Sequence, residues 1–119
     1  MFNGTNGEVF DYYPRLNRLR EYVEKSYSEP ISLGNAASIA ALESSYFSTY
    51  FRAKVGINFT EWLRQVRIRK AMKLMKASDF SITEVAYEVG FADLRTFERA
   101  FKKHTQMTPM RFKKSVRPE

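Results

Sequence analysis

The fold is decided by residues 81–109, SITEVAYEVGFADLRTFERAFKKHTQMTP, which hold two short helix patterns separated by Gly90. Ser81 and Glu84 have the spacing of a capping box, which satisfies free amides at the start of a helix. Gly90 follows the last periodic apolar residue, where helices commonly end in a left-handed conformation that glycine adopts easily. Asp93 is a competent N-cap for a second helix. The stretch therefore predicts a helix-turn-helix.

The second helix of this pair, expected over Leu94 to Lys103, has an apolar seam and a polar front. Phe97, Ala100 and Phe101 recur at helical spacing and predict the buried side. The opposite side carries a mostly basic set of residues, namely Leu94, Arg95, Glu98, Arg99 and Lys102. A helix fits the major groove and guanidinium forks match guanine O6 and N7, so this face could read base edges. The competing interpretation is an ordinary solvated, ion-paired helix face.

The composition fits a soluble helical domain with an anionic partner. The 119 residues are 44% hydrophobic and 15% aromatic, enough for a sizeable core. Twenty Lys and Arg against 13 Asp and Glu give a formal charge of +7, which favours nucleic acid or acidic lipid as a partner. No apolar run is long enough to span a membrane and the first residues lack the pattern of a signal peptide, so a cytoplasmic protein is expected.

The same composition leaves little for catalysis or metal binding. The chain has no cysteine and one histidine, His104, which removes disulfides, thiolate metal sites and most catalytic dyads. His104 ends the proposed second helix, where an imidazole complements the helix dipole or simply packs. The sequence therefore predicts no enzyme, no catalytic or metal-binding residue and no cofactor.

The pattern of residues 81–109 occurs a second time, about 50 residues earlier in the chain, which indicates an internal duplication. Ser32 corresponds to Ser81, and Ala41 stands where Gly90 stands. In the second helix of this earlier copy Phe47, Tyr50 and Phe51 correspond to Phe97, Ala100 and Phe101, which predicts the same buried seam. The residues at the positions of the basic front are here small and mostly hydroxylated, namely Ser44, Ser45, Ser48, Thr49 and Arg52. Hydroxyls bond phosphates or several base edges, so this copy is expected to contribute positioning and shape readout, unless its front is merely solvated.

The remaining segments complete an all-α arrangement of about seven helices. Residues 1–13 lack periodicity and are expected to be a flexible arm or remnant linker. Residues 14–56 form the first helix-turn-helix subdomain, beginning with a helix over Arg15 to Ser26. Residues 57–77 form a long linker helix, whose cations face phosphate or cover the core, with Arg67 expected to be structural. Residues 78–119 form the second subdomain.

On these residues the chain resembles the DNA-binding domain of the AraC/XylS family of bacterial transcription regulators, over roughly Leu16 to Lys114. The motifs that carry the resemblance are AxxVGF, FxRxFK and TP within Ile82 to Phe112, RIRKAMKLM at Arg67 to Met75, and Ala37, Phe51 and Gly56 in the first half. The sequence departs from the family pattern at three positions, which are Ala41, Glu43 and Gln106.

The resemblance implies two recognition helices, near Ser44 to Lys54 and Leu94 to Lys103, that enter successive major grooves of double-stranded DNA. Carried over by position, base contacts fall at Ser45, Ser48, Thr49, Leu94, Arg95, Glu98 and Arg99. Phosphate contacts are expected at Ser44, Arg52, Lys102 and Lys103. The family further implies transcription activation, RNA polymerase as a possible partner, and a monomeric module whose full-length protein can dimerise through another domain.

Two other classes of function also agree with the positive charge. One is a basic helical protein-interaction domain without sequence-specific DNA binding, and the other is an amphipathic membrane-surface binder. Neither accounts for the duplication of the helix-turn-helix pattern. Sequence-specific DNA binding with transcription regulation is therefore the preferred hypothesis.

Overall fold

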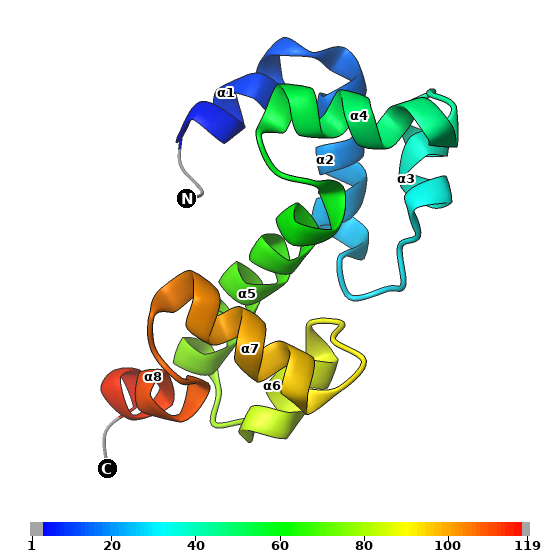
Figure 1. Ribbon diagram of the computed structural model, residues 1–119. Helices are drawn as coiled ribbons and strands as arrows, with labels where there is room; N and C mark the ends of the chain where they lie inside the picture. The colour runs from blue at the N-terminus through cyan, green and yellow to red at the C-terminus, as the bar shows by residue number, and fades with distance from the viewer. Residues whose placement is uncertain (1–3, 118–119) are drawn as a thin grey trace. The chain divides into compact units, whose positions relative to one another are not determined.

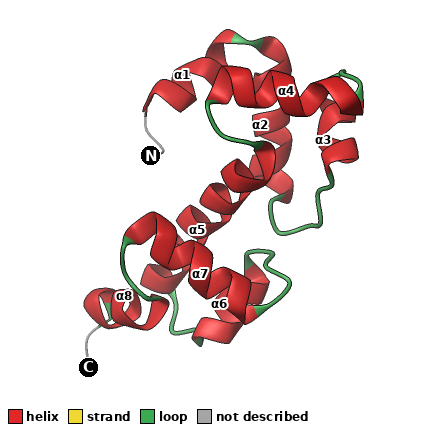
Figure 2. Cartoon of the chain, viewed as in Figure 1, coloured by secondary structure: helices red, strands yellow, loops and turns green. Residues whose placement is uncertain are grey.

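The computed structural model describes residues 4–117 (Figure 1). These residues contain eight α-helices and no strand (Figure 2). The chain divides into two compact units, a first unit that ends at Leu63 and a second unit that begins at Arg64. The all-α class is confirmed, and seven of the eight helices found in the described residues are the ones that the sequence predicted.

The first unit is built around a cluster of aromatic rings. Its helices are α1 (Gly4–Tyr12), α2 (Pro14–Ser26), α3 (Leu33–Ile39), α4 (Ser44–Val55) and the first residues of α5 (Phe59–Ala77). Phe51 of α4 contacts the rings of Phe59 and Trp62 of α5 at centroid distances of 5.6 and 5.7 Å. Leu16 and Leu19 of α2 are fully buried, and α2 packs against α1 and α3. Aromatic packing thus fixes how α4 is held within this unit.

The N-terminal segment corrects a prediction, because Gly4–Tyr12 is helix α1 and not part of a flexible arm. Residues 1–3 lie outside the described residues. Phe10 is 1% exposed and stacks on Trp62 with ring centroids 4.8 Å apart. Arg20 of α2 forms an ion pair with Asp11 at 2.5 Å. The glycines and asparagines of this segment favour turns, but burial of Phe10 by the rest of the unit outweighs that local preference.

The second unit contains the remainder of α5 with α6 (Ile82–Glu88), α7 (Leu94–Thr105) and α8 (Pro109–Val116). A row of phenylalanines, each within 5.3 to 5.6 Å of the next, forms much of its core: Phe91, Phe97, Phe101 and Phe112. Lys113 of α8 and Arg117, which follows α8, donate to the carbonyl oxygens of Phe80 and Lys76 at 3.0 and 3.2 Å. The C-terminal part of the chain is therefore bonded to the last turn of α5 and to the segment that follows α5.

Both units contain the helix-turn-helix that the duplication predicted, with matching caps at its first helix. The Ser81 hydroxyl accepts from the Glu84 amide at 3.1 Å, while Glu84 accepts from the Ser81 amide at 2.8 Å. In the earlier copy Ser32 and Asn35 make the same pair of bonds at 3.0 and 3.2 Å. The predicted capping box at Ser81 is confirmed. In α3 the Asn35 side chain accepts the hydrogen bond from the N-cap amide, as the Glu84 side chain does in α6.

The two turns are also equivalent, although one has a glycine and the other does not. Gly90 has φ 105° and the Phe91 amide after it donates to Ala86 at 3.0 Å. Ala41 has φ 60°. The Leu42 amide after it donates to the carbonyl oxygen of Ala37 in α3, five residues earlier, at 2.9 Å. These are helix-ending turns of one type, in which the bond reaches back to the last turn of the helix. Alanine thus occupies a left-handed position that glycine adopts more easily.

Helix α5 contributes to the cores of both units, so it is more than a linker between two subdomains. Phe59 and Trp62 are buried in the first unit, whereas Val66, Ile68 and Met75 are buried in the second. The division between the units falls inside this helix, between Leu63 and Arg64. The apolar residues of α5 occupy more than one face because successive parts of the helix cover different cores.

Candidate nucleic-acid interface

Helix α7 begins at a strong N-cap. The Asp93 Oδ1 atom accepts from the Thr96 amide at 2.7 Å, and Oδ2 accepts from the Thr96 hydroxyl at 3.1 Å. The backbone bond, followed by the hydroxyl bond, lowers the pKa of the Asp93 carboxyl below its usual range because both stabilise the carboxylate. The predicted N-cap is confirmed, and it holds the first turn of α7 in place.

The apolar seam of α7 sets which residues face outward. Phe97 and Phe101 are fully buried and Ala100 is nearly so, as the periodicity predicted. The opposite side of the helix is open to solvent, with Leu94 half-buried and the longer polar side chains exposed, namely Arg95, Glu98, Arg99, Lys102 and Lys103. The structure therefore brings together on one helix the predicted base-contacting residues of the second half.

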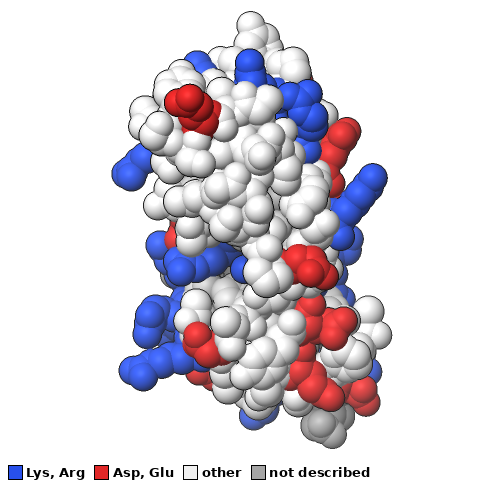
Figure 3. Space-filling view, turned by 90° about the vertical axis from the view of Figure 1, so that its right-hand side faces the viewer, with Lys and Arg blue, Asp and Glu red and all other residues white. Residues whose placement is uncertain are grey.

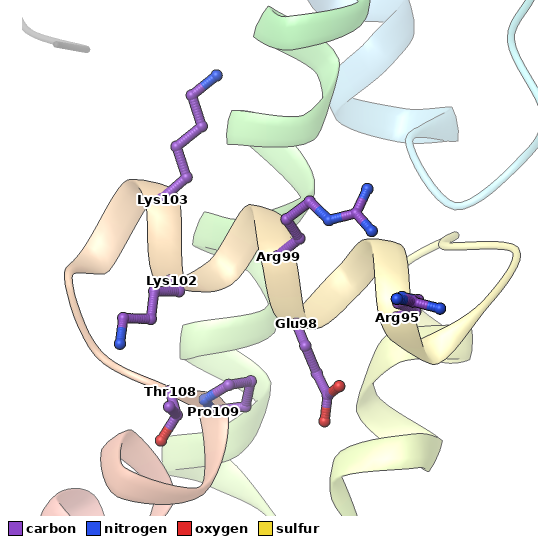
Figure 4. A pocket seen from close by; sticks show the side chains of 7 residues that line it. All are labelled: Arg95, Glu98, Arg99, Lys102, Lys103, Thr108 and Pro109. Atoms are coloured by element: carbon purple, nitrogen blue, oxygen red, sulfur yellow. The ribbon is translucent and has the colours of Figure 1, made fainter.

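The polar side chains of α7 project in two directions (Figure 4). Arg99 and Lys103 extend from one side of the helix, whereas Glu98 and Lys102 extend toward the side on which Thr108 and Pro109 lie. An open groove runs along this surface and is lined by Arg95, Glu98, Arg99, Lys102, Lys103, Thr108 and Pro109. This groove offers several cationic donors to a ligand and one carboxylate acceptor.

Helix α7 ends at Thr105 and is capped by Gln106, one of the three positions at which the sequence departs from the AraC/XylS pattern. Gln106 adopts a left-handed conformation with φ 65°, and its side-chain amide donates to the Lys103 carbonyl at 2.9 Å. This bond satisfies one of the carbonyls left free at the end of the helix. Thr108 then caps α8 by accepting from the Arg111 amide at 3.2 Å. The side chain of Gln106 thus accompanies a backbone conformation that glycine adopts more readily.

Helix α4 of the first unit has the same arrangement with different chemistry. Phe47, Phe51 and Val55 are buried, and they leave the predicted hydroxyl front exposed at Ser44, Ser45, Ser48, Thr49 and Arg52. Only Arg52 of this front carries a charge. The helix begins at Glu43, whose side chain makes no capping bond, and ends at Gly56 with φ 98°. The front is therefore shallow, carries a single positive charge and is capable of both donating and accepting hydrogen bonds.

The charge of the chain is divided unequally between the units. Arg64–Glu119 holds 14 of the 20 Lys and Arg and 6 of the 13 Asp and Glu, a formal charge of +8, so Met1–Leu63 has a formal charge of −1. In the lower part of Figure 3, which shows the second unit, basic side chains gather along one edge while acidic ones lie mainly elsewhere. Attraction to a polyanion is thus concentrated in the second unit.

The cations of α5 do not all have the same environment. Arg67 is half-buried, and burial, with a further contribution from the charge of Arg64, lowers the pKa of its guanidinium. A guanidinium stays protonated despite such a shift. Arg67 is therefore partly withdrawn from solvent, in agreement with the structural role predicted for it, while Lys73 and Lys76 are exposed.

Some residues near the front of α4 were missed by sequence reasoning. Tyr46 and Tyr50 of α4 lie beside the hydroxyl front. The ammonium group of Lys54 lies over the rings of Tyr13 and Tyr50, at 4.9 and 5.8 Å from their centroids. The periodicity of α4 placed Tyr50 in the buried seam, but it is half-buried and contacts Tyr46 at 5.9 Å. The signal in the sequence was the pair of tyrosines four residues apart, which face the same side of a helix.

Features of other site classes are absent from the part of the chain that the structure describes. Residues 4–117 contain no group of three His, Cys, Asp or Glu side chains that could hold a metal ion. Among the same residues no helix combines the length and apolar character needed to cross a bilayer.

Comparison with known proteins identifies the family. The family model described as "Helix-turn-helix domain" matches residues 36–115. The C-terminal domain of the two-component response regulator YesN from Fusobacterium nucleatum has a TM-score of 0.72 and 32% identity, covering 80% of this chain and 93% of that domain. The chain belongs to the AraC-type helix-turn-helix family. Members of this family are DNA-binding transcription regulators and not enzymes.

Two further relatives fit the AraC-type assignment. The Msm operon regulatory protein of Streptococcus mutans is 27% identical, over 85% of this chain and 36% of that protein. The DNA-binding domain of the global transcriptional factor AdpA, solved in complex with a target DNA, has the same fold with a TM-score of 0.77, 23% identity and coverage of 87% and 96%. This chain spans about a third of the length of three curated relatives it matches (34 to 36%) and 13% of the length of others.

Proposed function

We propose that this AraC-type domain binds double-stranded DNA sequence-specifically, with α4 and α7 as its two recognition helices in successive major grooves. The observation that carries the proposal is the front of α7, where Arg95 and Arg99 are exposed on a helix whose other side is fully buried. Such a helix presents rigid guanidinium donors to base edges. The charge of +8 on the second unit supplies the attraction to phosphate.

The two fronts have different roles in this proposal. In α7, base edges are contacted by Leu94, Arg95, Glu98 and Arg99, and phosphates by Lys102 and Lys103. In α4, base edges are contacted by Ser45, Ser48 and Thr49, and phosphates by Ser44 and Arg52. Hydroxyls bond several different base edges, whereas a guanidinium paired with guanine is selective. The second unit is therefore expected to dominate sequence choice and the first to add register and shape readout.

The proposal extends to the regulator in which the domain works. It binds DNA as a monomeric module, activates transcription beside RNA polymerase, and acts in the bacterial cytoplasm where the DNA lies. A longer protein can add dimerisation through a further domain, in keeping with the greater length of the curated relatives.

The test is selection of binding sites from a random duplex library with the full chain, followed by affinity measurement across a salt series. Each phosphate neutralised adds about −0.9 to the slope of log K against log salt concentration. We expect an enriched sequence and a steep slope. Hydroxyl-radical footprinting of the enriched duplex should then show two protected patches on one face, about 10 base pairs apart.

Each part of the proposal has an outcome that contradicts it. A flat salt slope with no enriched sequence would reject DNA recognition and favour a basic helical domain that docks an acidic protein. An enriched site with a single protected patch would keep sequence-specific binding but reject the use of both helices.

A further inference from the structure

A row of tyrosines crosses from α1 to α4 on the surface of the first unit. The ring centroids of Tyr12 and Tyr13 are 4.9 Å apart, those of Tyr13 and Tyr50 are 6.4 Å apart, and those of Tyr50 and Tyr46 are 5.9 Å apart. Lys54 lies over two of these rings. We call these five residues the tyrosine row. It joins the N-terminal helix, which sequence reasoning left without a role, to a recognition helix.

The ends of the row are open to solvent. Tyr12 is 77% exposed and Tyr46 is 53% exposed, so neither ring serves mainly as core. Tyr13 and Tyr50 between them are half-buried and hold the row together. Exposed tyrosines fixed by ring contacts are rigid and each carries a hydroxyl that can donate a hydrogen bond.

Within the row, Tyr46 flanks the side of α4 that is proposed to face the bases, whereas Lys54, nine residues after Ser45, lies about 180° from it around the helix axis. Successive helical residues are about 100° apart, so Tyr46 lies about 60° from Thr49 and about 100° from Ser45 around the helix axis. A helix about 10 Å across nearly fills a major groove about 12 Å wide, so its flanks approach the sugar-phosphate backbones. With Ser45 and Thr49 turned toward the bases, Tyr46 is directed at one wall of the groove.

The first unit also needs such contacts, because it has little positive charge to offer. Its formal charge is −1 and the front of α4 carries only Arg52. Anchoring this unit to phosphate therefore depends on neutral donors and on the few cations near the groove. Tyrosine hydroxyls are common phosphate ligands in protein–DNA complexes. Asp11, the acidic neighbour of the row, is paired with Arg20.

We propose that Tyr46, the end of the tyrosine row on α4, binds the phosphate backbone beside the groove that α4 occupies, with its hydroxyl donating to a phosphate oxygen and the row holding its ring in place. The contact is sequence-independent. This inference rests on the proposed function.

The test uses the full chain and its enriched duplex, with affinity measured by fluorescence anisotropy across a salt series. Tyr46→Phe removes only a hydroxyl, so we expect affinity to fall about 3- to 10-fold, as for the loss of one hydrogen bond, with an unchanged salt slope. The matched control is Tyr22→Phe on α2, which should bind as the wild-type chain does.

Two further readouts separate this inference from its competitors. The enriched sequence should be the same for wild-type chain and variants, since phosphate contacts carry no base information. Replacing the flanking phosphates with methylphosphonates should weaken wild-type binding and abolish the difference between wild-type chain and Tyr46→Phe.

The outcomes that overturn the inference are distinct from those that overturn the proposed function. If the wild-type chain binds DNA specifically and Tyr46→Phe binds equally well, Tyr46 is not a phosphate ligand. If Tyr46→Phe changes the enriched sequence, Tyr46 contacts bases and the inference is again wrong. If the wild-type chain binds no duplex, the proposed function fails and the inference fails with it. Trp62 fluorescence verifies that the first unit of each variant is folded.

Discussion

The guanidinium of Arg15 donates a 2.6 Å hydrogen bond to the carbonyl oxygen of Ala41, at the turn of the first helix-turn-helix. It donates a second bond to Ala40 at 3.2 Å, and Arg18 adds a bond to Ile39 at 3.3 Å. Cations near the C-terminus of a helix stabilise its free carbonyls. The turn with alanine at positive φ is thus held from α2 by two arginines.

The first prediction concerns the strain at this turn. Ala41→Gly should stabilise the first unit by about 0.5 kcal/mol, because relief of the left-handed conformation slightly exceeds the greater entropy of glycine in the unfolded chain. Trp62 is the only tryptophan and its ring contacts are in the first unit, so its fluorescence during urea unfolding measures the change. The control is Ala53→Gly in the interior of α4, which should destabilise by about 1 kcal/mol. Equal losses for both variants would show that Ala41 is not strained.

The reciprocal prediction concerns Gly90, which has φ 105°. Gly90→Ala should destabilise the second unit by about 1–2 kcal/mol, since a Cβ disfavours the left-handed conformation. Far-UV circular dichroism during urea unfolding provides the measurement. Gly34→Ala is a control that should raise stability instead of lowering it. Gly34 lies in helix α3, and a Cβ added there would meet Ser32 Oγ at an ordinary contact distance of 3.7 Å. An unchanged unfolding midpoint for Gly90→Ala would contradict the turn assignment.

A third prediction tests whether α1 belongs to the first unit. Phe10→Ala should lower the free energy of unfolding of this unit by about 3 kcal/mol, as for loss of a buried phenylalanine. The emission of Trp62 should shift to longer wavelength, because Phe10 stacks on its indole. Tyr12→Ala, which alters a 77% exposed side chain on the same helix, should have a much smaller effect on stability. If the two variants are equally stable, α1 is not packed as described.

The pH dependence of the second unit should report the Asp93 cap. The folded-state pKa of Asp93 is lowered, so its contribution to stability is present above the unfolded-state value of about 3.9 and is lost as pH falls through the folded-state pKa. Asparagine caps a helix without titrating. The stability difference between wild-type chain and Asp93→Asn should therefore shrink between pH 7 and pH 3. Asp79→Asn corrects for the general effect of net charge, and the same trend in both variants would contradict the assignment.

The last prediction concerns the guanidinium groups of α7. Arg95→Ala and Arg99→Ala should each cost about 1–3 kcal/mol in affinity for the enriched duplex and relax preference at one base position. Lys114→Ala, which removes an exposed cation from α8, should leave base preference unchanged. If Arg95→Ala or Arg99→Ala weakens binding to all sequences uniformly, that arginine contacts phosphate.

Sequence reasoning was accurate for elements that depend on local features and failed for elements that depend on contacts between residues far apart in the chain. Helix α7 could be predicted nearly to its ends because its cap at Asp93, its preceding turn at Gly90 and its apolar seam are local features. Helix α1 could not, since its stability comes from Phe10 packing on Trp62, which is 52 residues away. The tyrosine row was missed for the same reason, because it exists only once α1 and α4 are brought together. The duplication helped at Ala41, where the residue alone gives no indication of a turn.

The DNA contacts depend on more than the packing of the chain. Burial explains why Arg95 and Arg99 face outward, and the family relationship explains why that face matters. The specific contacts of α4 and α7 stay predictions, because they depend on how both helices meet a duplex. Chemistry favours Arg95 over Ser45 as a selective reader, since a bidentate donor discriminates among bases more strongly than a hydroxyl.

The position of the division inside α5 has a consequence for protein engineering. A fragment cut in the loop before Phe59 would lose the rings of Phe59 and Trp62 and with them much of the first hydrophobic core. Chimaeras that exchange one helix-turn-helix half between regulators should therefore be joined within the helix, between Leu63 and Arg64, so that each half keeps its own share of α5.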